Sequence, residues 1–379
     1  MASLIHLNPA ARDYTYNAPS GAEGGTDEHT VLAFHQTLPS YNETTLHTLP
    51  SLAASLGLSH VLVKDESDRF GLPAFKILGA SWAVYRAVLS AIDANNGQQN
   101  MTVPELGAVA RDRGLSIVTS TEGNCGRAVA RMAKYLGLPA RVFVPAYMSE
   151  GTRRKIRGEG AEVLVVNGSY EDTIPVIRRE AADREGERVG ARRGPRGYFV
   201  EGYSSMLAES EKQVPELTGG KPATHAIVPC GAGSIAQAVV QHYKGAQRQE
   251  QHGGAAVMAV EATNAACLKA SLEAGEATDV PTADTIMNGM NCGTLSTLAW
   301  PVLREGVDAS VVVADHESHA AVEEMKSSGI LAGPCGAATL AALRRVCADP
   351  HARSSLALGS ESIVVLHCTE GSRDYQIPS

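Results

Sequence analysis

The sequence of 379 residues lacks the patterns that would assign it to a membrane, a secretory pathway or nucleic acid. No apolar run approaches the ~20 residues that a membrane-spanning helix needs. The first residues show neither a basic region nor the continuous apolar stretch of a secretory signal. Lysines and arginines form no dense stripe with interleaved aromatic residues, and the formal net charge is -8. We therefore expect a soluble, cytoplasmic protein that binds neither a membrane nor nucleic acid.

Cysteine is scarce, and its spacing excludes two further classes. The chain has 7 cysteines, an odd number, and none of them forms a C-x-x-C pair. This pattern fits neither a disulfide framework nor a structural zinc site, so reduced thiols are expected. The segment HESH, residues 316–319, is the nearest approach to a metal motif, but it lacks the i, i+4 histidine spacing of a zinc-protease helix. No metal site is expected.

What the chain does contain is a regular alternation of short apolar runs with helical patterns. The runs are HVLVKDE, LSIVTS, RVFVPA, EVLVVN, HAIVPC, AVMAVEA, SVVVAD and SIVVLHC. Buried strands separated by helices predict parallel sheets with helices on both faces, so the predicted fold class is α/β. With 44% hydrophobic residues, a chain of this length can bury a large core, in about two domains.

A glycine-rich loop is predicted between a strand and a helix. In VPCGAGSIAQAVV, residues 228–240, the apolar strand is followed by Gly231, Ala232, Gly233 and Ser234. Small residues let backbone N–H groups close around a phosphate, and the positive end of the helix dipole favours the anion. The same G-x-G-x-x-A pattern fits a dinucleotide-binding turn, and a tight turn that needs small residues only for packing would look alike. The loop therefore indicates a phosphate without specifying the compound that carries it.

A second loop collects short polar side chains at a predicted helix start. TSTEGNCGRAVARMAKYLG, residues 119–137, carries Ser120, Thr121, Gly123 and Asn124 in close succession. A helix cap needs a single polar side chain, whereas several of them beside a glycine form a better cradle for a carboxylate. We predict that this loop binds the carboxylate of a substrate; a simple helix cap is the alternative.

A threonine and a lysine complete the set of candidate residues. Thr369 ends the last apolar strand and is expected at the same crevice as both loops, because ligands collect at the carboxyl ends of strands in open sheets. A plain turn after a strand is the alternative. Lys76 lies in FGLPAFKILGASWA, residues 70–83, at the entrance of a predicted buried helix.

The apolar setting of Lys76 suggests a chemical role. Desolvation lowers the pKa of an amine and frees it as a nucleophile. A lysine that only extends its amine to solvent would be the structural alternative. A phosphate cradle, a carboxylate cradle and this lysine together indicate pyridoxal phosphate held as an imine on Lys76.

The same segments resemble the fold type II pyridoxal phosphate enzymes, and among them the diaminopropionate ammonia-lyases. The likeness rests on KDESDRFGLPAFKILGASWA, TEGNCGRAVARMA, PCGAGS, GMNCGTLSTLAWPVL and HCTEGSRD, in the family's order. It implies a fold like that of the tryptophan synthase β subunit, with two lobes that each contain a largely parallel, twisted sheet flanked by helices. The large cofactor-binding lobe is expected at 1–84 and 196–379, and the smaller substrate-side lobe at 85–195. A homodimer is also implied.

Carried over position by position, the resemblance implies a role for each residue of the candidate site. Lys76 would form the Schiff base, the loop of residues 231–234 would hold the cofactor's phosphate, and Asn124 would lie near its phenolic oxygen. Thr369 would meet its pyridine nitrogen, as a neutral partner that suits elimination. Glu122 stands where the family has an aspartate base, so Glu122 and the freed Lys76 are the two base candidates.

The predicted reaction is α,β-elimination of ammonia, or of another β leaving group, from a small amino acid such as 2,3-diaminopropionate, giving a keto acid and ammonia. The family has a histidine where this chain has Cys125, and a second catalytic aspartate for which no equivalent precedes Glu201. Three alternatives therefore stay open. They are a racemase, dehydratase or β-replacement synthase on the same scaffold, a non-catalytic relative that binds the cofactor, and a nucleotide-binding oxidoreductase built on GAGSIA.

Overall fold

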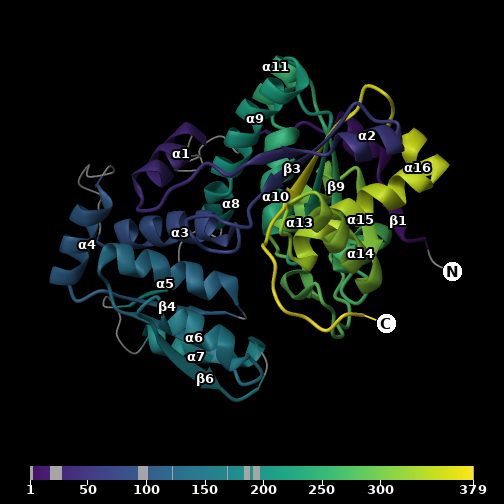
Figure 1. Cartoon of the computed structure of the whole chain (residues 1–379). Helices are drawn as coiled ribbons and strands as arrows, with labels where there is room; N and C mark the ends of the chain where they lie inside the picture. The colour runs from purple at the N-terminus through teal and green to yellow at the C-terminus, as the bar shows by residue number, and fades with distance from the viewer. Residues whose placement is uncertain are drawn as a thin grey trace. The chain divides into compact units, whose positions relative to one another are not determined.

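The computed structural model describes residues 3–17, 28–92, 101–121, 123–168, 170–182, 188–190 and 197–378. Glu122 lies outside these residues, so its role stays a prediction. The chain forms two compact units (Figure 1). Unit 1 consists of Met1–Thr26, Glu43–Arg69 and Met206–Ser379, and unit 2 consists of Asp27–Asn42 and Phe70–Ser205.

Unit 1 is built on a seven-stranded sheet with the strand order β1-β10-β9-β8-β11-β3-β2. Its strands are β1 (Ile5–Leu7), β2 (Leu46–Thr48), β3 (His60–Asp65), β8 (His225–Pro229), β9 (Ala256–Ala262), β10 (Ala309–Val313) and β11 (Ile363–Cys368). The five inner strands are parallel, and the two edge strands pair antiparallel. Strands β8, β10 and β11 are buried at every position, which explains why they read as continuous apolar runs.

Helices cover both faces of this sheet. The helices of unit 1 are α2 (Pro50–Leu56), α9 (Ser204–Thr218, which begins in unit 2), α10 (Ser234–Tyr243), α11 (Ala246–His252), α12 (Cys267–Ala274), α13 (Ala299–Gly306), α14 (Asp315–Ser327), α15 (Pro334–Ala348) and α16 (Pro350–Ser355). The Ile227 side chain of β8 packs in one core with α14 and α15. Its buried neighbours Ala226 and Val228 lie outside that core, and α10 also contacts β8. Because successive side chains of a strand point to opposite faces, α10 and α15 cover opposite sides.

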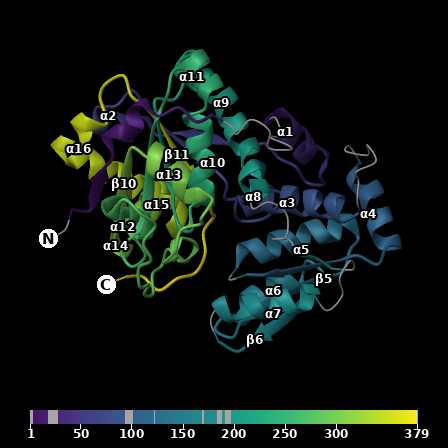
Figure 2. The same cartoon turned by 180° about the vertical axis from the view of Figure 1, so that it is seen from behind.

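Unit 2 contains a smaller parallel sheet with the strand order β6-β5-β4-β7. Its strands are β4 (Ser116–Ser120), β5 (Ala140–Pro145), β6 (Glu162–Val166) and β7 (Arg188–Gly190), and its helices are α1 (Glu28–Thr37), α3 (Lys76–Ala91), α4 (Val103–Asp112), α5 (Asn124–Leu136), α6 (Glu150–Arg157), α7 (Tyr170–Ala182) and α8 (Gly197–Gly202). Helices α3 and α5 lie side by side in both views (Figure 1, Figure 2). The α/β class with a largely parallel sheet in each of two parts is confirmed.

The boundaries between the two units differ from the expected lobe boundaries of 84/85 and 195/196. The chain passes from unit 1 to unit 2 at 69/70 and returns at 205/206. Helix α3 belongs wholly to unit 2 because it packs against α5 and α8, and α1 follows because it packs against α3. Such packing leaves no mark in composition. The cofactor-binding and substrate-side roles of the two parts stay predictions.

None of the helices in the described part of the chain combines the length and the apolar character that a membrane crossing requires.

Candidate active site

The glycine-rich loop leads from β8 into α10, and its second glycine is required by the turn. Gly233 is the N-cap of α10 and has a left-handed backbone with a φ of 95°. A Cβ at this position would lie 2.8 Å from Leu303 Cδ1 and 3.0 Å from Ala299 Cβ, both on α13. Glycine therefore serves two needs here, a positive φ and close packing against α13.

The start of α10 leaves its first backbone N–H groups without a partner among the residues that the structure describes. No side chain caps this helix. The first helical hydrogen bond runs from the Gln237 N–H to the Gly233 carbonyl, at 2.8 Å. The N–H groups of residues 234–236 have no acceptor among the described residues, and they lie at the positive end of the helix dipole. This arrangement fits the phosphate of a cofactor.

Thr369 lies at the same edge of the same sheet. It follows β11, which is the neighbour of β8, so its loop and the glycine-rich loop leave adjacent parallel strands that are about 4.8 Å apart. The Thr369 side chain is buried, and within the described residues its hydroxyl makes no hydrogen bond. Two of the three predicted loops are thus brought together within unit 1.

Glu370 holds the Thr369 loop against the start of α15. Its Oε1 accepts the Cys335 N–H at 3.0 Å, and its backbone carbonyl accepts the Gly333 N–H at 2.9 Å. A Cβ on Gly336 would lie 2.7 Å from the Cys368 Sγ, which shows how closely the two segments pack. The position of Thr369 is therefore fixed by its neighbours on both sides.

Lys76 is the first residue of α3 in unit 2. Its neighbours Phe75, Ile77 and Leu78 are buried, as the apolar sequence predicts, but the lysine side chain itself is only half-buried. The Lys76 Nζ lies 4.7 Å from the centroid of the Phe75 ring. An amine over an aromatic face is attracted to it without losing its access to solvent.

Thr121 organises the loop between β4 and α5. Its Oγ1 accepts the N–H groups of Gly123 at 3.0 Å and of Gly126 at 2.9 Å, and it donates to the Gly123 carbonyl at 3.2 Å. A Cβ on Gly126 would lie 2.1 Å from the Thr121 Cγ2. The hydroxyl is thus engaged inside the loop, so Thr121 shapes the predicted carboxylate cradle from within.

The other members of this loop differ in exposure. Ser120 is 1% exposed, and its Oγ has no hydrogen-bond partner in the described part of the chain. Gly123 and Asn124 are half-buried, and Asn124 is the first residue of α5. Because α3 and α5 pack against each other within unit 2, the helix that begins at Lys76 and the helix that begins at Asn124 are neighbours.

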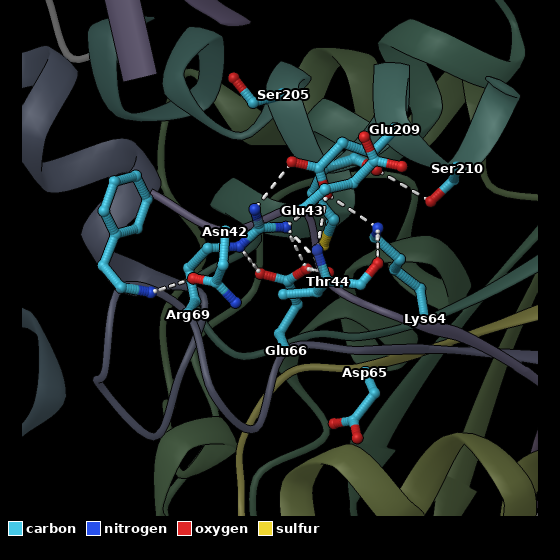
Figure 3. Close-up of polar contacts among 12 residues, drawn as sticks. Asn42, Glu43, Thr44, Lys64, Asp65, Glu66, Arg69, Ser205, Glu209 and Ser210 are labelled. Atoms are coloured by element: carbon cyan, nitrogen blue, oxygen red, sulfur yellow. Dashed lines mark hydrogen bonds and ion pairs between the residues drawn. The ribbon is translucent and has the colours of Figure 1, made fainter. Parts of the chain in front are cut away.

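A buried network of charged groups precedes the Lys76 segment (Figure 3). The Arg69 guanidinium donates to both oxygens of Glu66 and of Glu209 at distances of 2.6–2.8 Å. The Lys64 Nζ donates to Glu209 Oε2 and to the Thr44 carbonyl, both at 2.8 Å. All five residues are buried. Buried charges are tolerated when they are paired and hydrogen-bonded, and this set meets that condition.

The electrostatics of the network follow from this geometry. Burial disfavours the charged Glu209 carboxylate, but the hydrogen bonds and charges of Arg69 and Lys64 outweigh burial and lower the pKa of Glu209 to about 2. Burial lowers the pKa of Lys64, and Glu209 opposes that shift. The network fixes the end of β3 and the last residue before the chain enters unit 2.

Comparison with known proteins identifies the family. The model of the family described as pyridoxal-phosphate dependent enzyme matches residues 37–369. The chain belongs to this family. A dinucleotide as the phosphate compound bound by GAGSIA is therefore not supported, and pyridoxal phosphate is the cofactor. The residues present fit it, because α10 offers uncapped N–H groups next to a buried threonine that lacks a hydrogen bond to any described residue.

Individual relatives agree with the family. The diaminopropionate ammonia-lyase of Salmonella typhimurium is 30% identical over 96% of this chain and 94% of its own length. The diaminopropionate ammonia-lyase of Escherichia coli K12 is also 30% identical, over 90% of this chain and 87% of its own. The crystal structure of the Escherichia coli enzyme in complex with an aminoacrylate-PLP azomethine reaction intermediate superposes with a TM-score of 0.80 at 26% identity, covering 97% of this chain and 94% of that chain. The resemblance to fold type II enzymes of the ammonia-lyase group is confirmed.

Two residues of this pyridoxal phosphate enzyme belong to the charged network at the end of β3 but were not found from the sequence. They are Arg69 and Glu209. The charged residues Lys64 and Glu66, in and after an apolar strand, were a usable signal, because charges in such a run need buried partners. Glu209 gave no signal, since its partner Lys64 lies 145 positions away in the sequence.

Proposed function

We propose that this enzyme catalyses the α,β-elimination of ammonia from 2,3-diaminopropionate, with a keto acid and a second molecule of ammonia as products. The observation that carries the proposal is the 30% identity with the Salmonella typhimurium diaminopropionate ammonia-lyase over 96% of this chain. The cofactor, when bound, supplies an electron sink that stabilises negative charge at the α carbon of the substrate.

Each unit by itself carries groups that suit this chemistry. In unit 1, the N–H groups at the start of α10 and the loop of Gly231, Ala232, Gly233 and Ser234 would hold the phosphate. In unit 2, the Lys76 amine would hold the cofactor and, once free, would take up the α proton of the substrate. Its half-buried position keeps the amine accessible for both tasks.

Thr369 provides a neutral hydroxyl for the pyridine nitrogen of the cofactor. The carboxylate next to it, Glu370, is engaged with the Cys335 N–H and with Arg373, whose Nε lies 3.5 Å from Glu370 Oε1. The carboxylate adjacent to Thr369 is therefore engaged elsewhere, which leaves the Thr369 hydroxyl as the proposed neutral partner. A moderate electron sink suits elimination, in which the leaving group departs soon after the proton is removed.

The substrate carboxylate is assigned to the loop before α5. Gly123 and Asn124 offer backbone and amide donors, Ser120 adds a buried hydroxyl without a described partner, and Thr121 keeps the loop in shape. Asn124 also serves as the neighbour of the cofactor's phenolic oxygen. Glu122, in the same loop, is the second base candidate and is assigned to the enantiomer that Lys76 does not deprotonate.

We further propose that the enzyme works as a cytoplasmic homodimer whose only ligand besides its cofactor is a small amino acid. The net charge of -8 supports the absence of nucleic acid among its partners. Light scattering coupled to size-exclusion chromatography checks the dimer, and a monomer of 39.8 kDa would refute it.

The test of the function is product release from a panel of amino acids. L- and D-2,3-diaminopropionate, L- and D-serine and L-threonine are incubated with the purified enzyme and with Lys76→Ala. Release of a keto acid and two equivalents of ammonia from diaminopropionate, with a loss of at least ~10³-fold in Lys76→Ala, supports the proposal. Keto acid from serine or threonine alone would point to a dehydratase. Inversion of an enantiomer without keto acid would point to a racemase, and no turnover at all would point to a non-catalytic relative.

A further inference from the structure

The first turn of α3, which begins at Lys76, touches α8 at the level of the backbone. A Cβ on Gly79 would lie 2.6 Å from the Tyr203 Cε1, and a Cβ on Gly202 would lie 2.5 Å from the Leu78 carbonyl oxygen. Real Cβ atoms do not come so close to other atoms, so neither glycine can be replaced without a shift of one helix. The close approach therefore fixes where the turn after Lys76 lies.

Tyr203 extends this contact to the residue before Lys76. Its ring centroid lies 4.8 Å from that of Phe75, at an interplanar angle of 48°. Both side chains are buried, at 3% and 5% exposure. The Lys76 Nζ lies 4.7 Å from the same Phe75 ring. The aromatic surface that attracts the amine thus rests on Tyr203, and moving Tyr203 moves that surface.

His35 of α1 supports the same turn from a third element. Its Nε2 lies 3.0 Å from the Leu78 carbonyl oxygen, and its Nδ1 lies 2.6 Å from the Ser205 Oγ. A carbonyl only accepts, so Nε2 carries the hydrogen. His35 is fully buried. The carbonyl that Gly202 approaches is therefore also held by a hydrogen bond, and the turn has little freedom to relax around an intruding methyl group.

We propose that Gly202 and Tyr203 are positioning residues for the Lys76 amine. The contact of Gly202 with the Leu78 carbonyl fixes the position of the first turn of α3. The contact of Tyr203 with Phe75 fixes the ring on which the amine lies. Lysine has a long, flexible side chain, so its amine reaches one reactive position only if both its backbone and its contact surface are fixed. The inference rests on the proposed function, in which Lys76 carries the cofactor.

The test uses variants that separate three effects: loss of the Tyr203 ring, insertion of a methyl group at Gly202, and a general loss of stability. Tyr203→Leu removes the ring beneath Phe75, and Tyr203→Phe keeps it. Gly202→Ala inserts a methyl group against the Leu78 carbonyl. Gly151→Ala, on α6 of the same unit, is the matched control, because a Cβ there meets only the Ser149 Oγ at 3.9 Å.

Three quantities are measured on each holoenzyme. The first is the fraction of cofactor that borohydride fixes on the peptide containing Lys76, determined by mass spectrometry. The second is the pH midpoint of the cofactor's absorbance band, and the third is kcat beside KM. We expect Tyr203→Leu and Gly202→Ala to shift the pH midpoint, to lower the fixed fraction at least ~3-fold, and to lower kcat ~10- to 100-fold with little change in KM, since small displacements of a reacting group cost rates of this order. Tyr203→Phe, which keeps the ring, should retain the pH midpoint, the fixed fraction and kcat far better than Tyr203→Leu, and Gly151→Ala should match the wild type.

A melting temperature for each variant keeps a structural effect apart from positioning. A lower melting temperature in Tyr203→Leu and Gly202→Ala, with wild-type pH midpoint, labelling and kcat, would overturn the proposal. If Gly202→Ala fails to fold, Tyr203→Leu against Tyr203→Phe decides the matter. Lys76→Ala tests the underlying function separately. Borohydride label on a different lysine in the wild type would refute the assignment of Lys76 itself, whatever the variants at 202 and 203 do.

Discussion

Helices α5 and α10 begin in loops that look alike in the sequence, yet they differ in what occupies their first N–H groups. In the loop before α5, Thr121 accepts two backbone N–H groups, those of Gly123 and Gly126. At the start of α10 no side chain of the described residues takes that place. The loop with more polar side chains uses one of them on itself, whereas the plainer loop leaves its donors without a described acceptor. The start of α10 is therefore where we propose that an anion binds.

Two further helix starts at the sheet of unit 1 sharpen this contrast. Glu261 accepts the N–H groups of Leu268 at 2.7 Å and of Lys269 at 2.8 Å at the start of α12. Glu370 accepts the Cys335 N–H at the start of α15. The protein therefore supplies a carboxyl oxygen as acceptor at α12 and α15, whereas the described residues supply none at α10, which is where we place the phosphate of the cofactor.

The difference between α10 and the other helix starts is tested most strongly by giving α10 a side-chain acceptor of its own. Ser234→Asp places a carboxylate at the first residue of α10, beside the N–H groups that are proposed to bind the phosphate, while Ser234→Asn has nearly the same shape without the charge. Repulsion between charges about 4 Å apart at an interface is worth a few kcal/mol, so we expect the Kd for pyridoxal phosphate to be ~10²- to 10³-fold higher in the Asp variant than in the Asn variant.

An absorbance titration of the apoenzyme measures both constants. Pyridoxal without its phosphate is the control ligand, and its affinity should differ little between the two variants. Equal Kd values of Asp and Asn variants for pyridoxal phosphate, with both proteins folded, would mean that the phosphate binds elsewhere.

The carboxylate cap of α12 predicts a pH dependence of stability. Glu261 is fully buried, and burial raises its pKa from 4.5 to about 7 despite the hydrogen bonds that it accepts. Between these values the folded protein binds a proton that the unfolded chain has released, so the stabilisation is complete below pH 4.5 and is lost as the pH rises through about 7. The difference is on the order of 3 kcal/mol.

Urea unfolding at pH 5 and pH 8 checks the direction in which the free energy of unfolding changes with pH. The free energy of unfolding of the wild type should fall relative to Glu261→Gln as the pH rises, because the Gln variant has no titrating group at this position. Parallel pH profiles of the two proteins would show that Glu261 stays ionised in the folded state at all these pH values.

The sequence predicted where the loops before α5 and α10 lie, but not which groups bind the backbone N–H groups of each loop. Gly231 and Gly233 are visible as a glycine spacing after an apolar strand, and local spacing is what a sequence preserves. The role of Thr121 inside its own loop was hidden, since the same residue types suit a cap and a substrate cradle. Contacts such as Gly79 with Gly202 join segments more than 100 positions apart, so no local pattern announces them.

The same reasoning explains the boundary between the units. The expected boundaries, 1–84 and 196–379, place Lys76 in the larger lobe. Its helix instead packs within unit 2, and the buried pair of Arg69 with Glu209 marks the last residue before that change. Arg69 and Glu209 lie in no apolar run, so their buried pairing cannot be told from solvated charges in the sequence alone.

The cap of α5 can be removed with little change of shape. Thr121→Val keeps the volume and loses the hydroxyl, which leaves the N–H groups of Gly123 and Gly126 without their acceptor. We expect a loss of about 1–2 kcal/mol in the free energy of unfolding, together with a raised KM for the amino acid and an unchanged Kd for pyridoxal phosphate. Urea titration and steady-state kinetics measure these, and Thr121→Ser, which keeps the hydroxyl, is the control. A Thr121→Val enzyme with wild-type stability would show that the loop does not depend on this cap.

The smallest effect is expected at Ser234, the first residue of α10. If backbone N–H groups hold the phosphate, Ser234→Ala leaves all of them in place and removes only one hydroxyl. A single hydrogen bond to a charged group is worth roughly 1.5–3 kcal/mol, and water and the remaining donors compensate part of it, so we expect the Kd for pyridoxal phosphate to rise only ~3- to 10-fold. Ser234→Thr, with its hydroxyl retained, should bind like the wild type. A rise of ~10³-fold or more in Ser234→Ala would mean that a side chain dominates the site. Helix α10 would then resemble α5 in depending on a hydroxyl, and the contrast between an uncapped and a capped helix start would no longer explain where the phosphate binds.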